Sequence, residues 1–389
     1  MSQESTKHNA RVIALYLPQF HPIPENDKWW GKGFTEWTNV AKAHPLFRGH
    51  YQPRIPADLG FYDLRLAETR EQQVQLAREA GIEAFCYYHY WFAGHQLLER
   101  PFNEVVESGQ PDFPFCLCWA NHTWSSATWS HNGSKSAVLM EQTYPGESDD
   151  YTHFMSLLPA FKDPRYYKID GKLVFSIFDV WTFPNISQFI QRWRDLAQKH
   201  GLPGFYFIGM THNTLPFVLN ADGTRKHSMP DIEHSAKIYN TVLSMGFDAV
   251  NSMGKRRGEL RSKGMIRNRI QRALEFYHLN TKTYTYDYAK TVKEFFAPED
   301  AWENVFPTIM PQWDRTARNA NHEGIYVNST PEHFREHIQN AIDIIKDKQP
   351  EHQVLFLKSW NEWAEGNYVE PDIKYGHGYL DAIKECVLG

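Results

Sequence analysis

The amino-acid sequence predicts a single (β/α)8 TIM barrel with elaborated loops, an α/β fold in which eight parallel strands close into a ring inside a layer of helices. Three observations lead to this prediction. Short apolar segments recur eight times, each is followed by a segment with helical periodicity, and unusual aromatic and polar residues gather directly after the apolar segments. A length of 389 residues suits one large domain of this kind.

Each apolar segment has the length and the residue types of a buried strand. Because parallel strands end on the same side of a barrel, the loops after them should form the functional surface. The predicted strands are RVIALYL (11–17), IEAFCYY (82–88), PFCLCWA (114–120), KLVFSIF (172–178), GFYFIGM (204–210), FDAVNS (247–252), VFPTIMP (305–311) and QVLFLKS (353–359).

Amphipathic segments separate these strands, with apolar residues three and four apart, as in 66–81, 187–201 and 330–348. Such segments predict helices that cover the outside of the barrel. Residues typical of helix ends support this interpretation. They are Ser187 and Thr330 as N-caps, Pro331 as a first helical residue, and Gly81 and Gly201 as C-terminal caps.

We interpret residues 1–10 as a disordered N-terminal tail and residues 11–389 as the barrel. Two long insertions, 31–60 and 211–235, are expected to form loops over the barrel mouth. The opening MSQESTKHNA lacks the apolar segment of a signal peptide, and no run approaches the roughly 18 apolar residues of a membrane span. We therefore expect a cytoplasmic protein without an integral membrane segment.

The composition excludes some classes of partner. A net charge of −5 argues against nucleic-acid binding, which favours basic proteins. Cys116 and Cys118 lie two apart in an apolar segment without a second ligand pair, so we interpret them as buried thiols. The sequence predicts neither a metal nor another cofactor, because the spacing of the loop histidines matches no standard ligand pattern. These histidines are His21, His89, His95, His122 and His131.

Two glutamates follow the last predicted strand, in the segment SWNEWAEGNYVEPD (359–372). On a helical turn, the spacing of Glu362 and Glu365 places their Cβ atoms about 5–6 Å apart on one side. Neighbouring carboxylates repel, so one of them keeps a proton near neutral pH while the other is ionised. This pair suits retaining cleavage of a glycosidic bond. The alternative is that E-x-x-E is a solvated helix face, which the flanking Trp360 and Trp363 make less favourable.

The aromatic residues fit the same interpretation, because sugar rings stack on flat side chains while their hydroxyls need polar partners. Trp29, Trp30 and Trp129 are further candidate platforms, although core packing explains any single tryptophan equally well. Glu36 and Asp314 suit either a substrate contact or a structural carboxylate. The predicted substrate-binding residues are Tyr16, Gln19, His21, Glu36, Trp37, Tyr88, His89, Trp91, Trp119, Asn121, Trp124, Trp313, Asp314, Trp360, Asn361 and Trp363.

A basic stretch, Lys255–Arg272, holds eight basic residues and one glutamate. We interpret it as an outer barrel helix with a solvated face. The alternative is contact with an anionic lipid surface, as a peripheral membrane segment, or with a phosphate linked to a glycan.

Three motifs together resemble the WbsX-type family of polysaccharide-locus proteins, which is similar to the family 99 glycoside hydrolases, the endo-α-mannosidases. They are ALYLPQFHPIPENDKWWGKGFTEWTNV (14–40), FCYYHYWF (85–92) and SWNEWAEGNYVEPDIKYGHGYLDAIKE (359–385). The resemblance implies a (β/α)8 fold, no metal and an α-linked glycan substrate. It also implies that Glu362 acts as the base toward the 2-hydroxyl of the sugar, forming a 1,2-anhydro intermediate, and that Glu365 is the acid/base.

The chain departs from the pattern of its relatives after the third strand. Where they commonly read N-E-N-W followed by W-D-G, this chain has Asn121, His122, Thr123 and Trp124, then WSHNG. Because an acidic pair is missing there, the resemblance does not imply mannose as the sugar.

The sequence therefore predicts a retaining, endo-acting glycoside hydrolase whose substrate is an α-linked oligo- or polysaccharide, such as an O-antigen or a capsule. One alternative is a glycosyltransferase of lipopolysaccharide assembly, against which the lack of a D-x-D motif argues. A second alternative is a glycan-binding protein without turnover. The sequence leaves the oligomeric state open.

Overall fold

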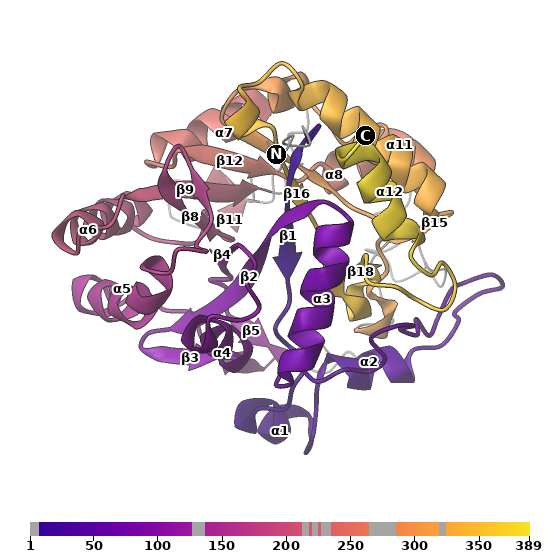
Figure 1. Ribbon diagram of the computed structural model, residues 1–389, viewed down its shortest axis with the longest axis horizontal. Helices are drawn as coiled ribbons and strands as arrows, with labels where there is room; N and C mark the ends of the chain where they lie inside the picture. The colour runs from indigo at the N-terminus through magenta and orange to yellow at the C-terminus, as the bar shows by residue number, and fades with distance from the viewer. Residues whose placement is uncertain are drawn as a thin grey trace, which may run out of the picture.

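The computed structural model describes residues 8–126, 137–211, 218–219, 225–226, 235–263, 285–318 and 324–389. Eight parallel strands form a closed ring, because β1 pairs with both β2 and β16 (Figure 1). The (β/α)8 prediction and all eight predicted strands are confirmed. The barrel strands are β1 (Arg11–Tyr16), β2 (Ile82–Phe92), β4 (Phe115–Trp119), β8 (Lys172–Ile177), β9 (Phe205–Thr211), β12 (Ala249–Ser252), β14 (Val305–Ile309) and β16 (Val354–Leu357).

Helices surround the ring and bury one face against it, as Figure 1 shows for α3, α5, α6 and α11. In α6, for example, Phe189, Ile190 and Trp193 are buried. The outer helices are α3 (Ala67–Glu79), α4 (Arg100–Ser108), α5 (Glu147–Phe161), α6 (Ile186–Lys199), α7 (Ser235–Ser244), α8 (Lys255–Lys263), α10 (Tyr288–Val292), α11 (Pro331–Ile345) and α12 (Gly378–Val387).

Short elements decorate the loops. The helices are α1 (Pro24–Trp30), α2 (Glu36–Lys42) and the 3-10 turns η2 (Pro298–Ala301), η3 (Arg315–Ala317), η4 (Pro350–His352) and η5 (Trp363–Glu365). The strands are β3 (His95–Leu97), β5 (Trp124–Ser125), β6 (Val138–Met140), β7 (Lys168–Ile169), β10 (Val218–Leu219), β11 (Arg225–Lys226), β13 (Thr285–Asp287), β15 (Ile325–Val327), β17 (Asn361–Glu362) and β18 (Asn367–Tyr368).

The helix ends agree with the sequence at most predicted positions. The Thr330 side chain accepts a hydrogen bond from the backbone N–H of His333, and Pro331 opens α11. Gly81 and Gly201 have φ of 80° and 70°, a conformation that glycine adopts readily. The Ser187 prediction is wrong. Helix α6 begins one residue earlier, at Ile186, and its N-cap is Asn185, which adopts a left-handed conformation tolerated by asparagine.

Contacts between the two ends of the chain begin before the predicted boundary of the barrel. The backbone N–H of Asn9 donates to the carbonyl of Val387 at 2.9 Å, and Ala10 is buried. Residues 1–7 and most of the insertion 211–235 lie outside the described residues. Cys116 and Cys118 are free, buried thiols, as predicted. No helix in the described part of the chain is long and apolar enough to cross a membrane.

Candidate active site

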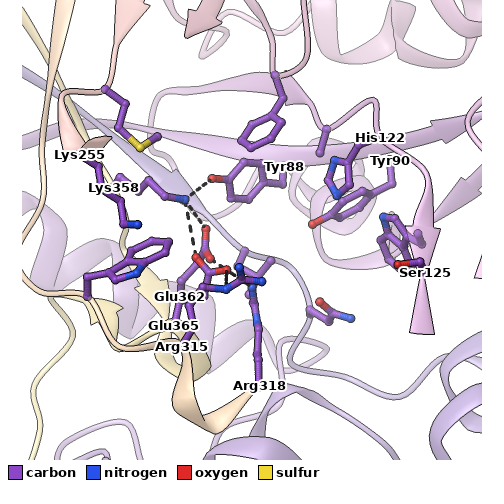
Figure 2. Close-up of a pocket in the computed structure, with 17 residues that line it drawn as sticks. Tyr88, Tyr90, His122, Ser125, Lys255, Arg315, Arg318, Lys358, Glu362 and Glu365 are labelled. Carbon is purple, nitrogen blue, oxygen red and sulfur yellow. Dashed lines mark hydrogen bonds and ion pairs between the residues drawn. The ribbon is translucent and has the colours of Figure 1, made fainter. Parts of the chain in front are cut away.

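A cavity of about 440 Å³ lies at the carboxyl ends of the barrel strands (Figure 2). Its walls come from the ends of the strands and from the loops that follow them, where this fold places its chemistry. It is lined by Leu17, Gln19, Tyr88, Tyr90, Ala120, His122, Trp124, Ser125, Phe178, Met253, Lys255, Trp313, Arg315, Arg318, Lys358, Glu362 and Glu365.

The last barrel segment delivers both predicted glutamates into this cavity. After β16, Asn361 anchors the chain to β1, since its side chain accepts from the backbone N–H of Leu17 at 2.7 Å and donates to the Leu17 carbonyl at 3.1 Å. Glu362 ends β17, and Glu365 ends the 3-10 turn η5. The predicted helical turn is therefore present, and it places the two side chains together.

Gly366 ends that turn with φ of 55°, which favours glycine. A Cβ atom at this position would lie 2.8 Å from both Arg54 Nε and Asp314 Cβ. The close approach of η5 to the loop after β14 therefore requires glycine for two independent reasons.

Glu362 is buried beside one lysine and one hydroxyl. Lys358 Nζ and Ser359 Oγ each donate to Glu362 Oε1 at 3.2 Å, and Arg318 Nη1 lies 3.6 Å from Oε2. Burial raises the pKa of Glu362, and the charge of Glu365 raises it further, whereas Lys358 and Arg318 lower it. The net direction of the shift is upward.

Glu365 lies among more cations. Arg318 Nη1 donates to its Oε1, Arg315 Nε lies 3.1 Å from the same oxygen, and Lys358 Nζ lies 3.9 Å from Oε2. Burial alone would raise the pKa of Glu365, but the charges of Arg318, Arg315 and Lys358 outweigh it and the pKa falls well below its ordinary value. The pKa values of these two neighbouring carboxyl groups are thus shifted in opposite directions.

This order is the reverse of the one that the family resemblance implies. The resemblance makes Glu362 a base and Glu365 the acid/base, whereas burial raises the pKa of Glu362 and the nearby cations lower the pKa of Glu365, which favours Glu362 as the acid and Glu365 as the carboxylate.

Arg318 links the pair to a third acid. Its Nε and Nη2 donate to Glu36 Oε1 at 2.9 and 2.7 Å. Complete burial raises the pKa of Glu36 to about 7, although the charge and the hydrogen bonds of Arg318 oppose this shift. The predicted site residue Glu36 therefore contacts Arg318 and does not line the cavity.

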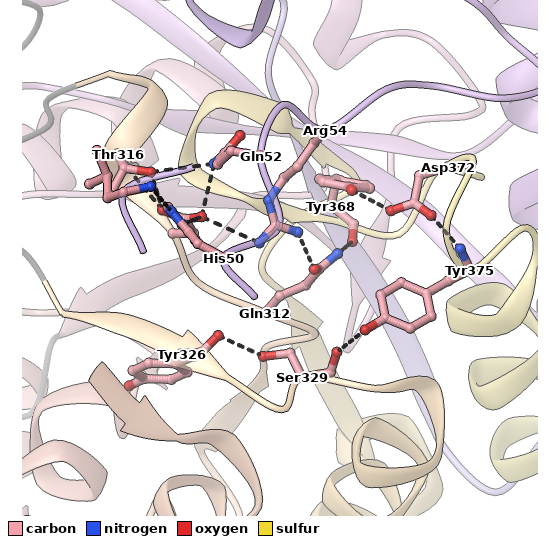
Figure 3. Close-up of polar contacts among 12 residues, drawn as sticks. His50, Gln52, Arg54, Gln312, Thr316, Tyr326, Ser329, Tyr368, Asp372 and Tyr375 are labelled. Atoms are coloured by element: carbon pink, nitrogen blue, oxygen red, sulfur yellow. Dashed lines mark hydrogen bonds and ion pairs between the residues drawn. The ribbon is translucent and has the colours of Figure 1, made fainter. Parts of the chain in front are cut away.

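Asp314 orients the turn that carries Arg315 and Arg318. Three of its hydrogen-bond partners, His50, Gln52 and Thr316, lie close together in Figure 3. His50 Nε2 lies 2.9 Å from its Oδ2, Gln52 Nε2 donates to that oxygen at 2.8 Å, and Thr316 Oγ1 donates to Oδ1 at 2.6 Å. Burial would raise the pKa of Asp314, but the bond from His50 and the charge of Arg54 lower it to about 2. An ionised Asp314 caps η3 and so fixes the position of the arginine-bearing turn.

A family model described as "Glycosyltransferase WbsX" matches residues 12–383, nearly the whole chain. The chain belongs to this WbsX family. Two curated relatives, both described as "Uncharacterized protein WxcX", come from strains B100 and ATCC 33913 of Xanthomonas campestris pv. campestris. Each is 33% identical over 379 residues, which cover 97% of this chain and 50% of the relative. The WbsX-family chain thus spans about half the length of these relatives.

Solved structures share the fold of this WbsX-family chain at low sequence identity. A "Glycoside hydrolase-like protein" has a TM-score of 0.54 and 15% identity, covering 99% of this chain and 96% of its own. The GH99 endo-alpha-mannosidase from Bacteroides thetaiotaomicron has a TM-score of 0.52 and 12% identity, covering 97% and 95%. These similarities show the barrel fold.

The cavity brings together six of the predicted site residues, namely Gln19, Tyr88, Trp124, Trp313, Glu362 and Glu365. The remaining predicted residues are buried outside its lining. They are Tyr16, His21, Glu36, Trp37, His89, Trp91, Trp119, Asn121, Asp314, Trp360, Asn361 and Trp363.

Several of these buried residues have hydrogen-bond or stacking partners within the protein. Trp119 Nε1 donates to the carbonyl of Trp91, and Trp91 stacks on His153 with ring centroids 4.6 Å apart. Trp363 stacks on Tyr368 at 3.7 Å. For this group the structure shows packing and hydrogen bonds, and direct contact with a sugar stays a prediction. Trp129 and His131 lie outside the described residues.

Sequence reasoning missed the cations of the cavity. Arg315 and Arg318 belong to the loop QWDRTARN, in which only Trp313 and Asp314 were predicted as site residues. Lys358 lies in the predicted strand QVLFLKS, one residue beyond β16. A lysine at the end of an apolar strand, next to a glutamate pair, was the available signal. Within the described residues, no group of three or more His, Cys, Asp or Glu side chains could hold a metal ion.

Proposed function

We propose that this chain is a retaining, endo-acting glycoside hydrolase that cleaves an α-linked bacterial polysaccharide, O-antigen-like or capsular, with Glu362 and Glu365. Membership of the WbsX family and the GH99-like barrel support an enzyme that acts on glycans. The finer proposal depends mainly on one observation. Two buried carboxyl groups of opposite protonation preference share one cavity at the end of the barrel where catalytic residues lie.

Glycosidic cleavage needs an acid for the leaving oxygen and a carboxylate for the sugar. In our proposal Glu362 holds the proton for the leaving oxygen, and Glu365 supplies the carboxylate, either to the anomeric carbon or to the 2-hydroxyl. Trp124 and Trp313 present aromatic surface to the sugar rings, while Gln19 and Tyr88 supply polar contacts.

The test uses a panel of α-linked polysaccharides without any nucleotide sugar. The wild-type protein should release fragments whose new reducing ends, followed by NMR from the first minutes, have the retained anomeric configuration. Glu362→Gln and Glu365→Gln should each lower kcat at least about a thousandfold, as expected for a positioned acid or base. Unchanged fragment release by both variants would contradict the proposal.

The two roles can be separated with an aryl glycoside, whose leaving group needs little protonation. Glu362→Gln should retain most of its turnover on that substrate, whereas Glu365→Gln should lose turnover on both substrates. If Glu362→Gln alone loses turnover of the aryl glycoside, then Glu362 is the base and Glu365 the acid/base, as the resemblance implies.

The glycosyltransferase alternative has one structural observation in its favour. Four cationic side chains line the cavity, and cations suit the diphosphate of a nucleotide-sugar donor. The same assay decides between the two functions if parallel reactions contain nucleotide sugars with a polysaccharide acceptor. Consumption of a donor without any cleavage in its absence would establish the transferase.

A further inference from the structure

The polar side chains that line the cavity include one imidazole, that of His122. We infer that His122 determines which sugar the cavity accepts, because its imidazole exchanges hydrogen bonds with one hydroxyl group of the sugar unit bound there. This inference rests on the proposed function and deepens it by naming a specificity-determining residue.

The charged side chains of the cavity already have charged partners. Lys358 Nζ lies 3.2 Å from Glu362 Oε1, and Lys255 Nζ lies 2.9 Å from Glu259 Oε1. Lys255 opens α8, which contains the first half of the basic stretch Lys255–Arg272, and residues 264–272 lie outside the described residues. Recognition of a ligand by groups without such partners has to come from elsewhere in the lining.

His122 is open to the cavity. The residue is exposed, and its ring contacts Phe178 with centroids 5.6 Å apart. Among the described residues, no side chain or backbone group forms a hydrogen bond with either ring nitrogen. A polar group without a protein partner is satisfied by solvent or by a ligand, so both nitrogens are available to a sugar.

The backbone next to His122 is held in place by Asn121, whose side chain is completely buried. Asn121 Nδ2 donates to the Tyr144 hydroxyl at 2.9 Å and to the Asp179 carbonyl at 2.8 Å, and its Oδ1 accepts from the backbone N–H of Asp179 at 2.8 Å. The backbone N–H of His122 donates to the Ala120 carbonyl at 3.0 Å. The loop after β4 therefore presents His122 to the cavity from a fixed backbone.

The imidazole is neutral at neutral pH. Burial lowers the pKa of His122 below its ordinary value of 6.5, although the charges of Asp179 and Glu365 oppose this shift. A neutral imidazole has one N–H donor and one acceptor nitrogen, which suits a hydroxyl group, itself both a donor and an acceptor. A site that binds a hydroxyl in this way discriminates against a sugar without it, because its own polar group is then left unpaired.

Tyr90 lies on the same side of the view in Figure 2 as His122, whereas Glu362 and Glu365 lie on the other side with Lys358. Tyr90 also lines the cavity, and its ring packs edge-on against Trp124 with centroids 5.0 Å apart. A sugar unit placed at the glutamates thus has a neutral polar wall opposite the charged one.

The experiment is a binding cycle that changes the protein and the sugar in turn. The ligands are methyl α-glycosides in the gluco, galacto and manno configurations, together with the monodeoxy derivatives of each at positions 2, 3, 4 and 6. NMR titration of the full chain measures the Kd of each sugar for wild type and for His122→Phe, which keeps a flat ring and removes both nitrogens.

His122→Phe should weaken binding of the preferred sugar about three- to tenfold, as expected for a lost hydrogen bond. Removal of one particular hydroxyl should weaken binding to wild type by a similar factor. The same deoxy sugar should bind to His122→Phe as well as its parent does, because the contact is already absent. A loss of packing alone would weaken the binding of all these sugars equally and would not depend on one hydroxyl.

His377→Phe is the matched control, because His377 is a histidine outside the cavity lining with a side chain 45% exposed. It should reproduce the affinities of wild type, and thermal unfolding of both variants checks their folding. The inference would be overturned if the effects of His122→Phe and of every deoxygenation were additive. It would also be overturned if His122→Phe bound all sugars as wild type does, or if wild type bound none of them.

Binding is measured without turnover, so this test is separate from that of the hydrolase. Cleavage of a polysaccharide by wild type, combined with additive effects in the binding cycle, would overturn only the inference. A hydroxyl-specific coupling to His122 without cleavage of any polysaccharide would count against the proposed hydrolase alone.

Discussion

The segment 359–372 has two acidic residues in each half. The acidic residues of the two halves differ in the side chains that surround them. Glu362 and Glu365 face cations in the cavity. Glu370 faces neutral donors in the core, where it accepts from Trp363 Nε1 at 2.6 Å, Gln73 Nε2 at 2.6 Å and the Tyr62 hydroxyl at 2.9 Å.

The difference shows how one residue type serves two purposes. Neutral donors satisfy a buried carboxyl group without fixing its charge, and burial then raises the pKa of Glu370 to about 7. Cations lower the pKa of a chosen carboxylate, as at Glu365, whereas burial raises the pKa of its neighbour Glu362. The first arrangement ties η5 to the core, and the second places a low-pKa carboxylate in the cavity.

Removal of Arg318 should have the largest effect, because this side chain contacts Glu36, Glu362 and Glu365. Arg318→Met leaves three buried carboxyl groups without their shared cation, which should cost about 3–5 kcal/mol of unfolding free energy and abolish turnover. Chemical denaturation at neutral pH measures the loss.

Arg318→Met/Glu36→Gln provides the control. Because the second substitution removes one of the uncompensated acids, it should restore part of the stability but none of the turnover. Full retention of stability in Arg318→Met would contradict the view that this cation holds the cavity together.

The fold was predictable because its signals are local. Apolar runs, helical periodicity and glycine at helix ends such as Gly81 and Gly201 are readable from short windows. The glutamate pair was predictable for a related reason, since the C-terminal ends of barrel strands meet at one face. The low pKa of Glu365 was not predictable from its neighbours in the sequence. Arg315 and Arg318, which lower it, reach Glu365 from a loop 47 residues or more away in the chain.

The tryptophans show that a position after a barrel strand does not by itself decide whether a side chain lines the cavity. Trp124 and Trp360 both follow barrel strands, yet Trp124 lines the cavity and Trp360 packs on Phe85 in the core with ring centroids 5.1 Å apart. The direction of a side chain depends on the backbone path of its loop, which no local window encodes.

The next largest effect concerns Glu370 and the pH dependence of stability. Its folded pKa, about 7, lies above the ordinary value of 4.5, so its stabilising contribution is complete below pH 4.5 and is lost as the pH rises through 7. This shift corresponds to at most about 3 kcal/mol. The unfolding free energy of wild type should therefore fall between pH 5 and pH 8 by more than that of Glu370→Gln, which stays neutral. Parallel denaturation curves for the two proteins across this range would contradict the prediction.

The smallest effect is the most informative about the proposed roles. Lys358 lies closer to Glu362 than to Glu365, at 3.2 Å against 3.9 Å, so Lys358→Met should raise the pKa of Glu362 more than that of Glu365. If Glu362 is the acid, the alkaline limb of the plot of kcat/KM against pH shifts to higher pH, and the plot broadens. If Glu362 is the base, the acidic limb shifts to higher pH, and the plot narrows. Lys358→Arg retains the charge and should leave the width unchanged, so the profile itself reports which glutamate holds the proton.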